Sequence, residues 1–305
     1  MRAALDAAPR ALKNVRSVLV IRHGWVVGER YYGGARAATL FEMRSVTKSF
    51  VAALFGAALR ERLIDSTGAT LFDALPGDFL TFDDTRKRAI TLRDLLAMRA
   101  GWSPDSATPA LEPRAAALIA RRLARPPGEQ WQYDDGTYHT LAAVVDHAVG
   151  GKLFDYATTR LFLPLGMTIP ASRWPADEQG VPFGSGGMTL TAREMAKLGF
   201  LYLHDGVWDS RRILAAGWVD SSWVARSTVG GGESPLNYGY GWWGFREGGH
   251  DFHFALGWGG QFIAVAPDLD LVVVVTANPY EEVPAPVQHF RALLRERLLP
   301  ALRPE

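Results

Sequence analysis

Two residues at the start of an apolar segment have types and spacing that can do nucleophilic chemistry. Ser45 and Lys48 lie three residues apart in FEMRSVTKSFVAALFGAALRERL. Positions i and i+3 share one face of a helix, so the lysine amine can reach the serine hydroxyl. A serine hydroxyl becomes a good nucleophile only when a neighbouring base takes its proton. The pattern therefore indicates a Ser-Lys nucleophile, with a capping serine and a solvated lysine as the alternative interpretation of so short a motif.

The helix start adds two effects at this pair. The backbone N–H of Ser45 has no intrahelical partner there and can donate to an oxyanion. The positive end of the helix dipole, together with burial, disfavours an ammonium, which would let Lys48 act as a base. The segment after Lys48 is apolar around most of its circumference, so we expect a buried helix, in which a lysine needs a partner.

A second candidate element is PPGEQWQYDDGTYH, residues 126–139, which reads as a turn-rich loop before a helix. Tyr133 in this loop could pass a proton between nucleophile and leaving group if its phenol lay against Lys48, because a nearby cation favours the phenolate. Trp131 and Asp135 flank it as candidate substrate-binding residues. The alternatives are a half-buried tyrosine at a helix start and an aspartate that only caps the helix.

The third element is the run Ala255-Leu256-Gly257-Trp258-Gly259-Gly260 on a predicted strand. Glycines within a strand mark places where a ligand or another backbone comes close, which makes Gly257 and Gly259 candidate substrate-contacting positions. The N–H of Trp258 is the best candidate for a second oxyanion donor, and its side chain for a substrate contact. A glycine-rich β-bulge is the alternative.

Composition limits the function classes. The chain has 305 residues, 48% of them hydrophobic, a net charge of +1 and no cysteine. The near-zero charge gives no electrostatic footprint for a nucleic acid, and no apolar run approaches the length of a membrane span. Without cysteine there is no disulfide, thiol nucleophile or thiolate metal site. We predict no metal and no cofactor, and no nucleic-acid or membrane partner.

The N-terminal stretch lacks the apolar core of a signal peptide. We therefore expect a cytoplasmic protein, or a periplasmic one if a leader has been removed.

Periodicity organises the chain into β-rich ends around a helical middle. Two β-rich runs, 17–22 and 25–32, meet at a turn at His23-Gly24, and short aromatic and β-branched runs resume from Tyr238. Helical spacing is predicted for the segments 90–102, 114–127, 136–151, 191–206 and 287–302. We predict an α/β sheet domain built from residues 1–62 and 236–305, enclosing a mostly helical domain over 63–235.

These blocks together resemble the serine β-lactamase and penicillin-binding-protein superfamily, in its class C-like branch. The blocks are FEMRSVTKSF, ITLRDLLAMRAGW, PPGEQWQYDDGTYHTLAAVV, LFLPLGM, GSGGMTLTAREMAKLG, YGYGWW and GWGGQFIAVAPDLDLVVVVT, in the family's order. The resemblance implies an α+β, β-lactamase/transpeptidase-like fold: an antiparallel sheet flanked by helices plus a mostly helical domain. It implies that Ser45 is acylated, that Lys48 and Tyr133 share the base and proton-relay roles, and that the N–H groups of Ser45 and Trp258 form the oxyanion hole.

Two departures from the family pattern bear on the substrate. Where lactamases and transpeptidases carry Lys/His-Thr-Gly, this chain has Ala255-Leu256-Gly257, without the cation and hydroxyl that hold a substrate carboxylate. Losing one charge-assisted contact of about 1.5–3 kcal/mol weakens binding by one to two decades. Arg246 or His253 could substitute. Asp135 stands where Asn is usual, and an anion beside Lys48 would hold it as an ammonium and hand more of the base role to Tyr133.

The resulting expectation is a bacterial serine hydrolase that acts through an acyl-enzyme on small esters or amides. The departures favour the esterase and nylon-oligomer-hydrolase side of the family, which includes 6-aminohexanoate-dimer hydrolases, over a β-lactamase or D,D-peptidase. A non-catalytic ligand-binding member of the fold is the alternative of another class. The tryptophans nearest the motifs are expected to line an apolar cleft: Trp102, Trp131, Trp242 and Trp258. His250 and His253 have a spacing compatible with a metal but would point to opposite faces of a strand.

Overall fold

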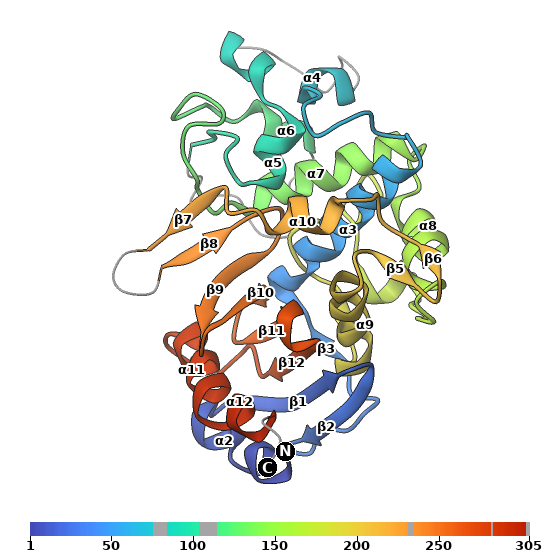
Figure 1. The fold of residues 1–305 in the computed structure, drawn as a ribbon. Helices are drawn as coiled ribbons and strands as arrows, with labels where there is room; N and C mark the ends of the chain where they lie inside the picture. Colours follow the sequence, from blue (N-terminus) through green and yellow to red (C-terminus); the bar gives the residue numbers. More distant parts are fainter. Residues whose placement is uncertain (76–83, 104–114, 231–234, 282, 303–305) are drawn as a thin grey trace.

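The computed structural model describes residues 1–75, 84–103, 115–230, 235–281 and 283–302 (Figure 1). Its strands are β1 Val15–Arg22, β2 Trp25–Tyr31, β3 Phe41–Glu42, β4 Thr189–Leu190, β5 Val207–Trp208, β6 Arg211–Arg212, β7 Ser227–Val229, β8 Leu236–Tyr238, β9 Trp243–Glu247, β10 His250–Gly257, β11 Gln261–Ala266 and β12 Leu271–Ala277. Its α-helices are α1 Arg2–Asp6, α2 Ala8–Ala11, α3 Thr47–Arg60, α4 Leu71–Ala74, α5 Leu92–Leu96, α6 Ala115–Ala120, α7 Asp135–Ala148, α8 Leu153–Ala157, α9 Ala192–Leu203, α10 Trp218–Trp223, α11 Pro286–Leu293 and α12 Leu299–Leu302.

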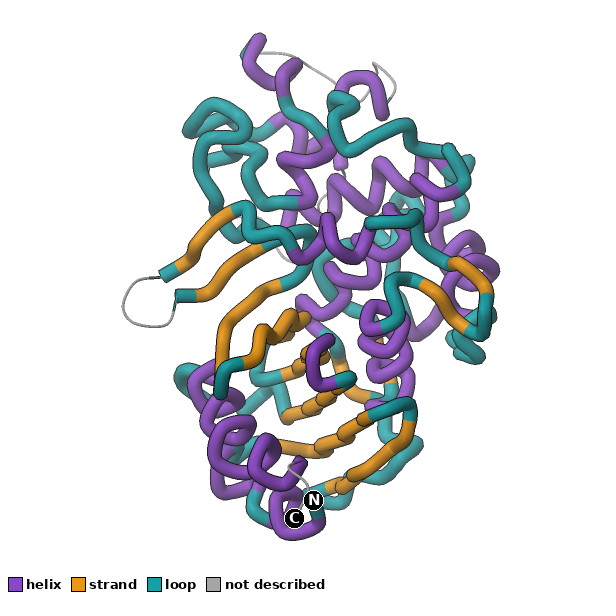
Figure 2. The backbone as a smooth tube through the Cα atoms, viewed as in Figure 1, coloured by secondary structure: helices purple, strands orange, loops and turns teal. Residues whose placement is uncertain are grey.

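Strands from both ends of the chain form one antiparallel sheet of eight strands, in the order β2-β1-β12-β11-β10-β9-β8-β7. The N-terminal hairpin joins the C-terminal strands through the β1–β12 pair, in which Val18 faces Val275. The predicted turn at His23-Gly24 has left-handed φ angles of 51° and 76°, which suits a two-residue hairpin turn. Figure 2 shows most of the strands in one half of the molecule and most helices in the other.

Side-chain alternation gives the sheet two cores. One face packs against α11 and the turns that follow it, where Phe262 stacks on Phe290 and Phe254 lies beside Phe262. The opposite face, which includes Ala255 and Ile263, belongs to the larger core shared with α3, α7 and α9. Both central strands β11 and β12 are buried along their whole length. Such double coverage explains why these strands read as continuous apolar runs rather than alternating ones.

The helical half agrees with the sequence in its long helices and departs from it in two short ones. The predicted helices 136–151 and 191–206 are α7 and α9. The segment 90–102 is helical only over Leu92–Leu96, because Met98 and Gly101 adopt left-handed φ angles of 56° and 84°. In the segment 114–127 the helix likewise ends at Ala120.

The predicted division into domains at residues 62 and 235 stays a prediction. The structure adds that α9, from the middle segment, packs against β11 and β12 and so covers one face of the sheet (Figure 1). The edge strand β7 also comes from that segment. None of the helices within the described ranges has the length and apolar character that a bilayer crossing requires.

Candidate active site

Ser45 lies in the 3-10 turn Arg44–Val46, which connects the short strand β3 to the buried helix α3. The turn is fixed on its sheet side by the hydrogen bond from the Met43 N–H to the Met188 carbonyl, 2.8 Å. Arg44, immediately before Ser45, has a left-handed φ of 49°, a conformation that costs a non-glycine residue free energy and often marks functional sites. This bend turns the chain so that Ser45 lines a cavity while the residues after it enter the core.

Lys48 is buried and donates all three protons of its ammonium group. Its Nζ lies 2.8 Å from Ser45 Oγ, 2.6 Å from Asp135 Oδ1 and 3.0 Å from the Ser185 carbonyl oxygen. An ammonium has three donors and no acceptor, and these three acceptors match them in number. The predicted reach of Lys48 to the Ser45 hydroxyl is therefore present.

The protonation of Lys48 decides between the two expectations from the sequence. Burial by itself lowers the pKa of Lys48, but the charges of Tyr133 and Asp135 and the hydrogen bonds they offer outweigh it, so the pKa is raised. The raised pKa argues against the expectation that burial and the helix dipole keep this lysine neutral, because the charges of Tyr133 and Asp135 oppose the effect of burial. The contact with Asp135 agrees with the expectation that this carboxylate holds Lys48 as an ammonium, and the division of the base role between Lys48 and Tyr133 stays a prediction.

The loop that carries Tyr133 is anchored on both sides of it. The Gln132 N–H donates to the Met98 carbonyl at 2.9 Å, and Asp134 receives a bidentate pair from Arg121 at 2.8 Å each. The Tyr133 ring lies with its centroid 4.9 Å from Lys48 Nζ and stacks on Trp243 at 6.0 Å. The phenol is thus brought to Lys48, as its proposed role requires.

The two consecutive aspartates at the start of α7 have different roles. Asp134 is the helix N-cap and accepts the Thr137 N–H at 2.7 Å. Asp135 is the first helical residue, and its carboxylate contacts Lys48. The interpretation of Asp135 as the cap is therefore wrong: the residue before it caps, which frees Asp135 for the site.

The end of β10 approaches the Ser45 turn as closely as a backbone can. A Cβ on Gly257 would collide with the carbonyl oxygen of Met43, so only glycine fits there. Gly259, with a φ of 80°, would meet the Pro279 backbone in the same way. Between them Trp258 lies at the edge of the cavity that contains Ser45, with its side chain 67% exposed.

The cavity has a volume of about 610 Å³. It is lined largely by apolar and aromatic groups, with few charged side chains. The lining residues include Trp131, Tyr133, Phe183, Trp243, Leu256, Trp258 and Val287 on the apolar side and Glu42, Arg44, Ser45, Asp135 and Ser185 on the polar side. Gly257 and Gly259 line it too, so the structure brings together all the site residues named from the sequence, with Lys48 beneath them.

The tryptophan prediction is half correct. Trp131 and Trp258 line the cavity, whereas Trp102 and Trp242 are 3% and 1% exposed and belong to the core. Trp243 lines the cavity in place of its neighbour, because adjacent residues on a strand point to opposite faces. Sequence reasoning also missed Ser185, whose contribution is a backbone carbonyl and leaves no side-chain signature.

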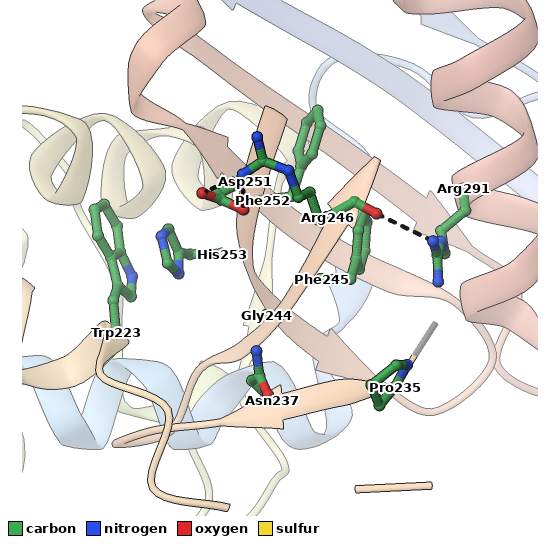
Figure 3. Close-up of a pocket in the computed structure, with 10 residues that line it drawn as sticks. All are labelled: Trp223, Pro235, Asn237, Gly244, Phe245, Arg246, Asp251, Phe252, His253 and Arg291. Atoms are coloured by element: carbon green, nitrogen blue, oxygen red, sulfur yellow. Dashed lines mark hydrogen bonds and ion pairs between the residues drawn. The ribbon is translucent and has the colours of Figure 1, made fainter. Parts of the chain in front are cut away.

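Arg246 and His253 do not replace the missing cation of the family motif. Both line a different cavity of about 430 Å³, between β9, β10 and α10. Figure 3 shows Arg246 directed to Asp251, 2.9 Å away, and the His253 ring stacked on Trp223. Arg44 is a cation that does line the Ser45 cavity, and it pairs with Glu42 at 3.0 Å.

The two histidines proposed as a weak metal alternative lie in separate surroundings. His250 Nδ1 is 2.6 Å from Asp268 Oδ2, and His253 is the ring on Trp223. Within the described ranges, no three His, Cys, Asp or Glu side chains gather in a way that could hold a metal ion.

Comparison with known proteins identifies the family. The family model described as Beta-lactamase matches residues 14–296, so the chain belongs to the β-lactamase family. A 6-aminohexanoate-dimer hydrolase from Paenarthrobacter ureafaciens is 30% identical over 92 residues, covering 30% of this chain and only 23% of that relative.

Solved structures support the fold. A Bacillus anthracis protein provisionally named 6-aminohexanoate-dimer hydrolase superposes with a TM-score of 0.78 at 21% identity, covering 99% of this chain and 81% of its own. EstCE1, described as a hydrolase with promiscuous acyltransferase activity, superposes with a TM-score of 0.77 at 19% identity, covering 96% and 97%. The family and the β-lactamase/transpeptidase-like fold predicted from the motifs are confirmed.

Proposed function

We propose that this protein is a serine hydrolase that cleaves small esters or amides through an acyl-enzyme on Ser45. The observation that carries the proposal is the ammonium of Lys48, which contacts Ser45 Oγ, Asp135 and the Ser185 carbonyl at once. A buried cation held against a serine hydroxyl costs free energy unless it is paired, and here it is paired so that one proton points at Ser45.

The proton path follows from that arrangement. Lys48 cannot accept a proton while it is an ammonium, so the phenolic oxygen of Tyr133, in its phenolate form, takes the proton of Ser45. Ser45 Oγ bonds to the substrate carbonyl carbon, and the carbonyl electron pair moves to oxygen. The N–H groups of Ser45 and Trp258 hold that oxyanion.

Collapse of the intermediate breaks the bond to the leaving group, which takes the proton back from Tyr133. A water molecule then repeats the sequence on the acyl-enzyme and releases the acid, regenerating Ser45. Lys48 stays charged throughout and stabilises the negative charge that forms on Ser45 Oγ and on Tyr133.

The cavity supports neutral acyl compounds over penicillins. Ala255 is fully buried and Leu256 lines the cavity, so neither offers a donor to a carboxylate. The aromatic walls, including Trp131, Trp243 and Trp258, suit an apolar acyl or leaving group. The likeness to a 6-aminohexanoate-dimer hydrolase and to EstCE1, a hydrolase with acyltransferase activity, is consistent with an enzyme that transfers acyl groups.

The experiment that tests this function compares turnover of four substrates by one preparation: p-nitrophenyl butyrate, 6-aminohexanoate dimer, nitrocefin and a D-alanyl-D-alanine peptide. We expect kcat/KM for the ester or the linear amide to exceed that for nitrocefin by at least the one to two decades that a lost carboxylate contact implies. Nitrocefin turnover equal to ester turnover would make the protein a β-lactamase. Binding of these compounds without any turnover would favour the non-catalytic alternative.

A further inference from the structure

A buried imidazole outside the cavity joins the site helix to the loop that holds Lys48. His139 lies on α7 one turn after Asp135 and is 1% exposed. Its Nε2 is 3.0 Å from Asp177 Oδ2, and its Nδ1 is 3.4 Å from the backbone nitrogen of Gly184. Both ring nitrogens are therefore engaged by the same segment of chain, residues 177–184.

The hydrogen-bond partners assign the tautomer. A backbone N–H can only donate, so Nδ1 must accept from Gly184. The proton then resides on Nε2 and is donated to the Asp177 carboxylate. A doubly protonated ring would set one N–H against another at Gly184, and so would the opposite neutral tautomer. The contact at Gly184 therefore requires one form of His139, the neutral ring protonated on Nε2.

Asp177 in turn organises its own loop. Its Oδ1 accepts the N–H groups of Gln179 and Val181 at 2.9 and 3.0 Å. Farther along, the Phe183 carbonyl accepts the indole N–H of Trp174 at 2.9 Å. Gly184 lies so close to α7 that a Cβ on it would collide with the carbonyl oxygen of Tyr138. The loop is thus fixed on α7 up to the residue before Ser185.

The next residue, Ser185, places its carbonyl oxygen 3.0 Å from Lys48 Nζ. We propose that His139 is a positioning residue for Lys48: its imidazole, aligned by Asp177, holds Gly184 so that the Ser185 carbonyl completes the lysine's set of three acceptors. The inference rests on the proposed function, because it assigns His139 to the same proton path, but its structural part can be tested without turnover.

Asp177→Asn is the sharpest variant, because it keeps the size of the side chain. The new amide would offer one donor and one acceptor where the loop and the imidazole need two acceptors, so one of the contacts must be lost. If the amide nitrogen faces the ring, Nε2 becomes the acceptor, and the proton moves to Nδ1, against the Gly184 N–H. His139→Phe removes both ring contacts, while His139→Asn keeps an acceptor near the place of Nδ1. His147→Gln, at an exposed position on the same helix, is the matched control.

We expect kcat to fall on the order of tenfold to a hundredfold in Asp177→Asn and His139→Phe, with His139→Asn affected less, as for any misplaced catalytic group. Loss of the Ser185 acceptor also destabilises the ammonium, so the alkaline limb of the kcat/KM profile should move to lower pH by roughly half a unit or more. A purely structural role would lower the melting temperature and leave that limb in place. His147→Gln should match the wild type in both kcat and pH profile.

Hydrogen exchange measured by mass spectrometry tests the role of His139 in holding the loop without relying on activity. Peptides covering residues 181–189 should exchange faster in Asp177→Asn and His139→Phe than in the wild type, while peptides from β11 and β12 stay protected. Folded variants with wild-type exchange in 181–189 and an unmoved alkaline limb would overturn the inference. If the wild type hydrolyses nothing, the proposed function fails, and the exchange result still decides whether His139 holds the loop.

Discussion

Asp135 stands where the family resemblance gives Asn, and its carboxylate favours the charged form of a lysine that could otherwise be a base. The carboxylate lies 2.6 Å from Lys48 Nζ. It is more than half exposed on its own side chain, whereas the lysine is 2% exposed, so water screens the pair from one side only. Together with the charge of Tyr133, this contact raises the pKa of Lys48 despite burial.

Asp135→Asn tests this directly and restores the residue usual in the family. Removing the charge of Asp135 and its hydrogen bond takes away two of the causes that raise the pKa of Lys48, while the opposing burial remains. The pKa of Lys48 should therefore fall, and because the charged form is the active one in the proposed mechanism, the alkaline limb of the kcat/KM profile should move to lower pH. A pH titration of initial rates measures the shift. An alkaline limb that stays in place or moves upward would mean that Lys48 does not act as an ammonium.

Lys48 and Tyr133 should behave as one unit. Tyr133→Phe and Lys48→Gln should each cost on the order of 10²–10⁴ in kcat, the usual contribution of a positioned acid–base group. The double variant should be little slower than the slower single variant, because either loss already breaks the shared proton path. Steady-state kinetics on all three variants measures how far the effects of the two substitutions on kcat depend on each other. If the loss of kcat in the double variant equals the product of the two single losses, Lys48 and Tyr133 act independently.

At the scale of elements, the site exists because the end of β10 is pressed against the turn that carries Ser45. Gly257→Ala should push the two apart, because the added methyl meets the Met43 carbonyl. With Trp258 displaced from the oxyanion, kcat should drop on the order of 10²–10³, as for the loss of one oxyanion donor. Gly244→Ala in the neighbouring strand is the control, since its nearest heavy atom would be 3.7 Å away. Equal rates in the two variants would show that the approach of β10 has no catalytic role.

The sequence predicts those elements whose structure is determined by residues close together in the chain. The Ser45–Lys48 contact was predictable because it spans one helical turn, and the β1–β2 hairpin because its turn residues tolerate left-handed angles. The segment 90–102 has helix-forming residues, yet its helix ends early because Trp102 forms a bridge with Leu123 instead. In this segment the pairing with a distant residue, and not the local helix propensity, determines the structure.

Contacts between segments far apart in the chain could not be predicted from local sequence patterns. The Ser185 carbonyl reaches Lys48 across 137 positions of sequence, and a backbone group has no residue type to recognise. Whether Trp242 or Trp243 faces the cavity depends on strand register, which a one-residue slip reverses. The alternative of Asp135 as the helix cap was off by one residue, because helix boundaries read from sequence are uncertain by that much.

At the scale of the whole molecule, the sheet and the helical half also meet away from the site, where His253 of β10 stacks on Trp223 of α10 at 4.2 Å. Burial lowers the pKa of His253 to about 4, with the nearby Asp251 opposing the shift. In the unfolded chain this imidazole titrates near its ordinary value. Between those two values the unfolded state binds a proton that the folded state does not, so stability falls as the pH is lowered through this range.

His253→Phe should remove this dependence while keeping an aromatic ring on Trp223. Relative to the wild type, the variant should lose less stability between pH 7.5 and 4, by about 3 kcal/mol if the pKa shift is fully expressed. Urea unfolding at the two pH values measures the difference. In the control variant His147→Phe, at an exposed position, stability should change with pH as it does in the wild type. A His253→Phe protein whose stability falls with acid as steeply as the wild type's would contradict the buried, neutral imidazole.

Acylation of Ser45 is the claim on which the rest depends, and one measurement tests it. The protein is treated with a fluorophosphonate, and the digested peptides are weighed by mass spectrometry, with Ser45→Ala treated in parallel. We expect a single mass increment on the peptide containing FEMRSVTK in the wild type and none in the variant, which should fold normally because only a hydroxyl is lost. Undiminished labelling of the Ser45→Ala protein, or a label on another serine in the wild type, would contradict it.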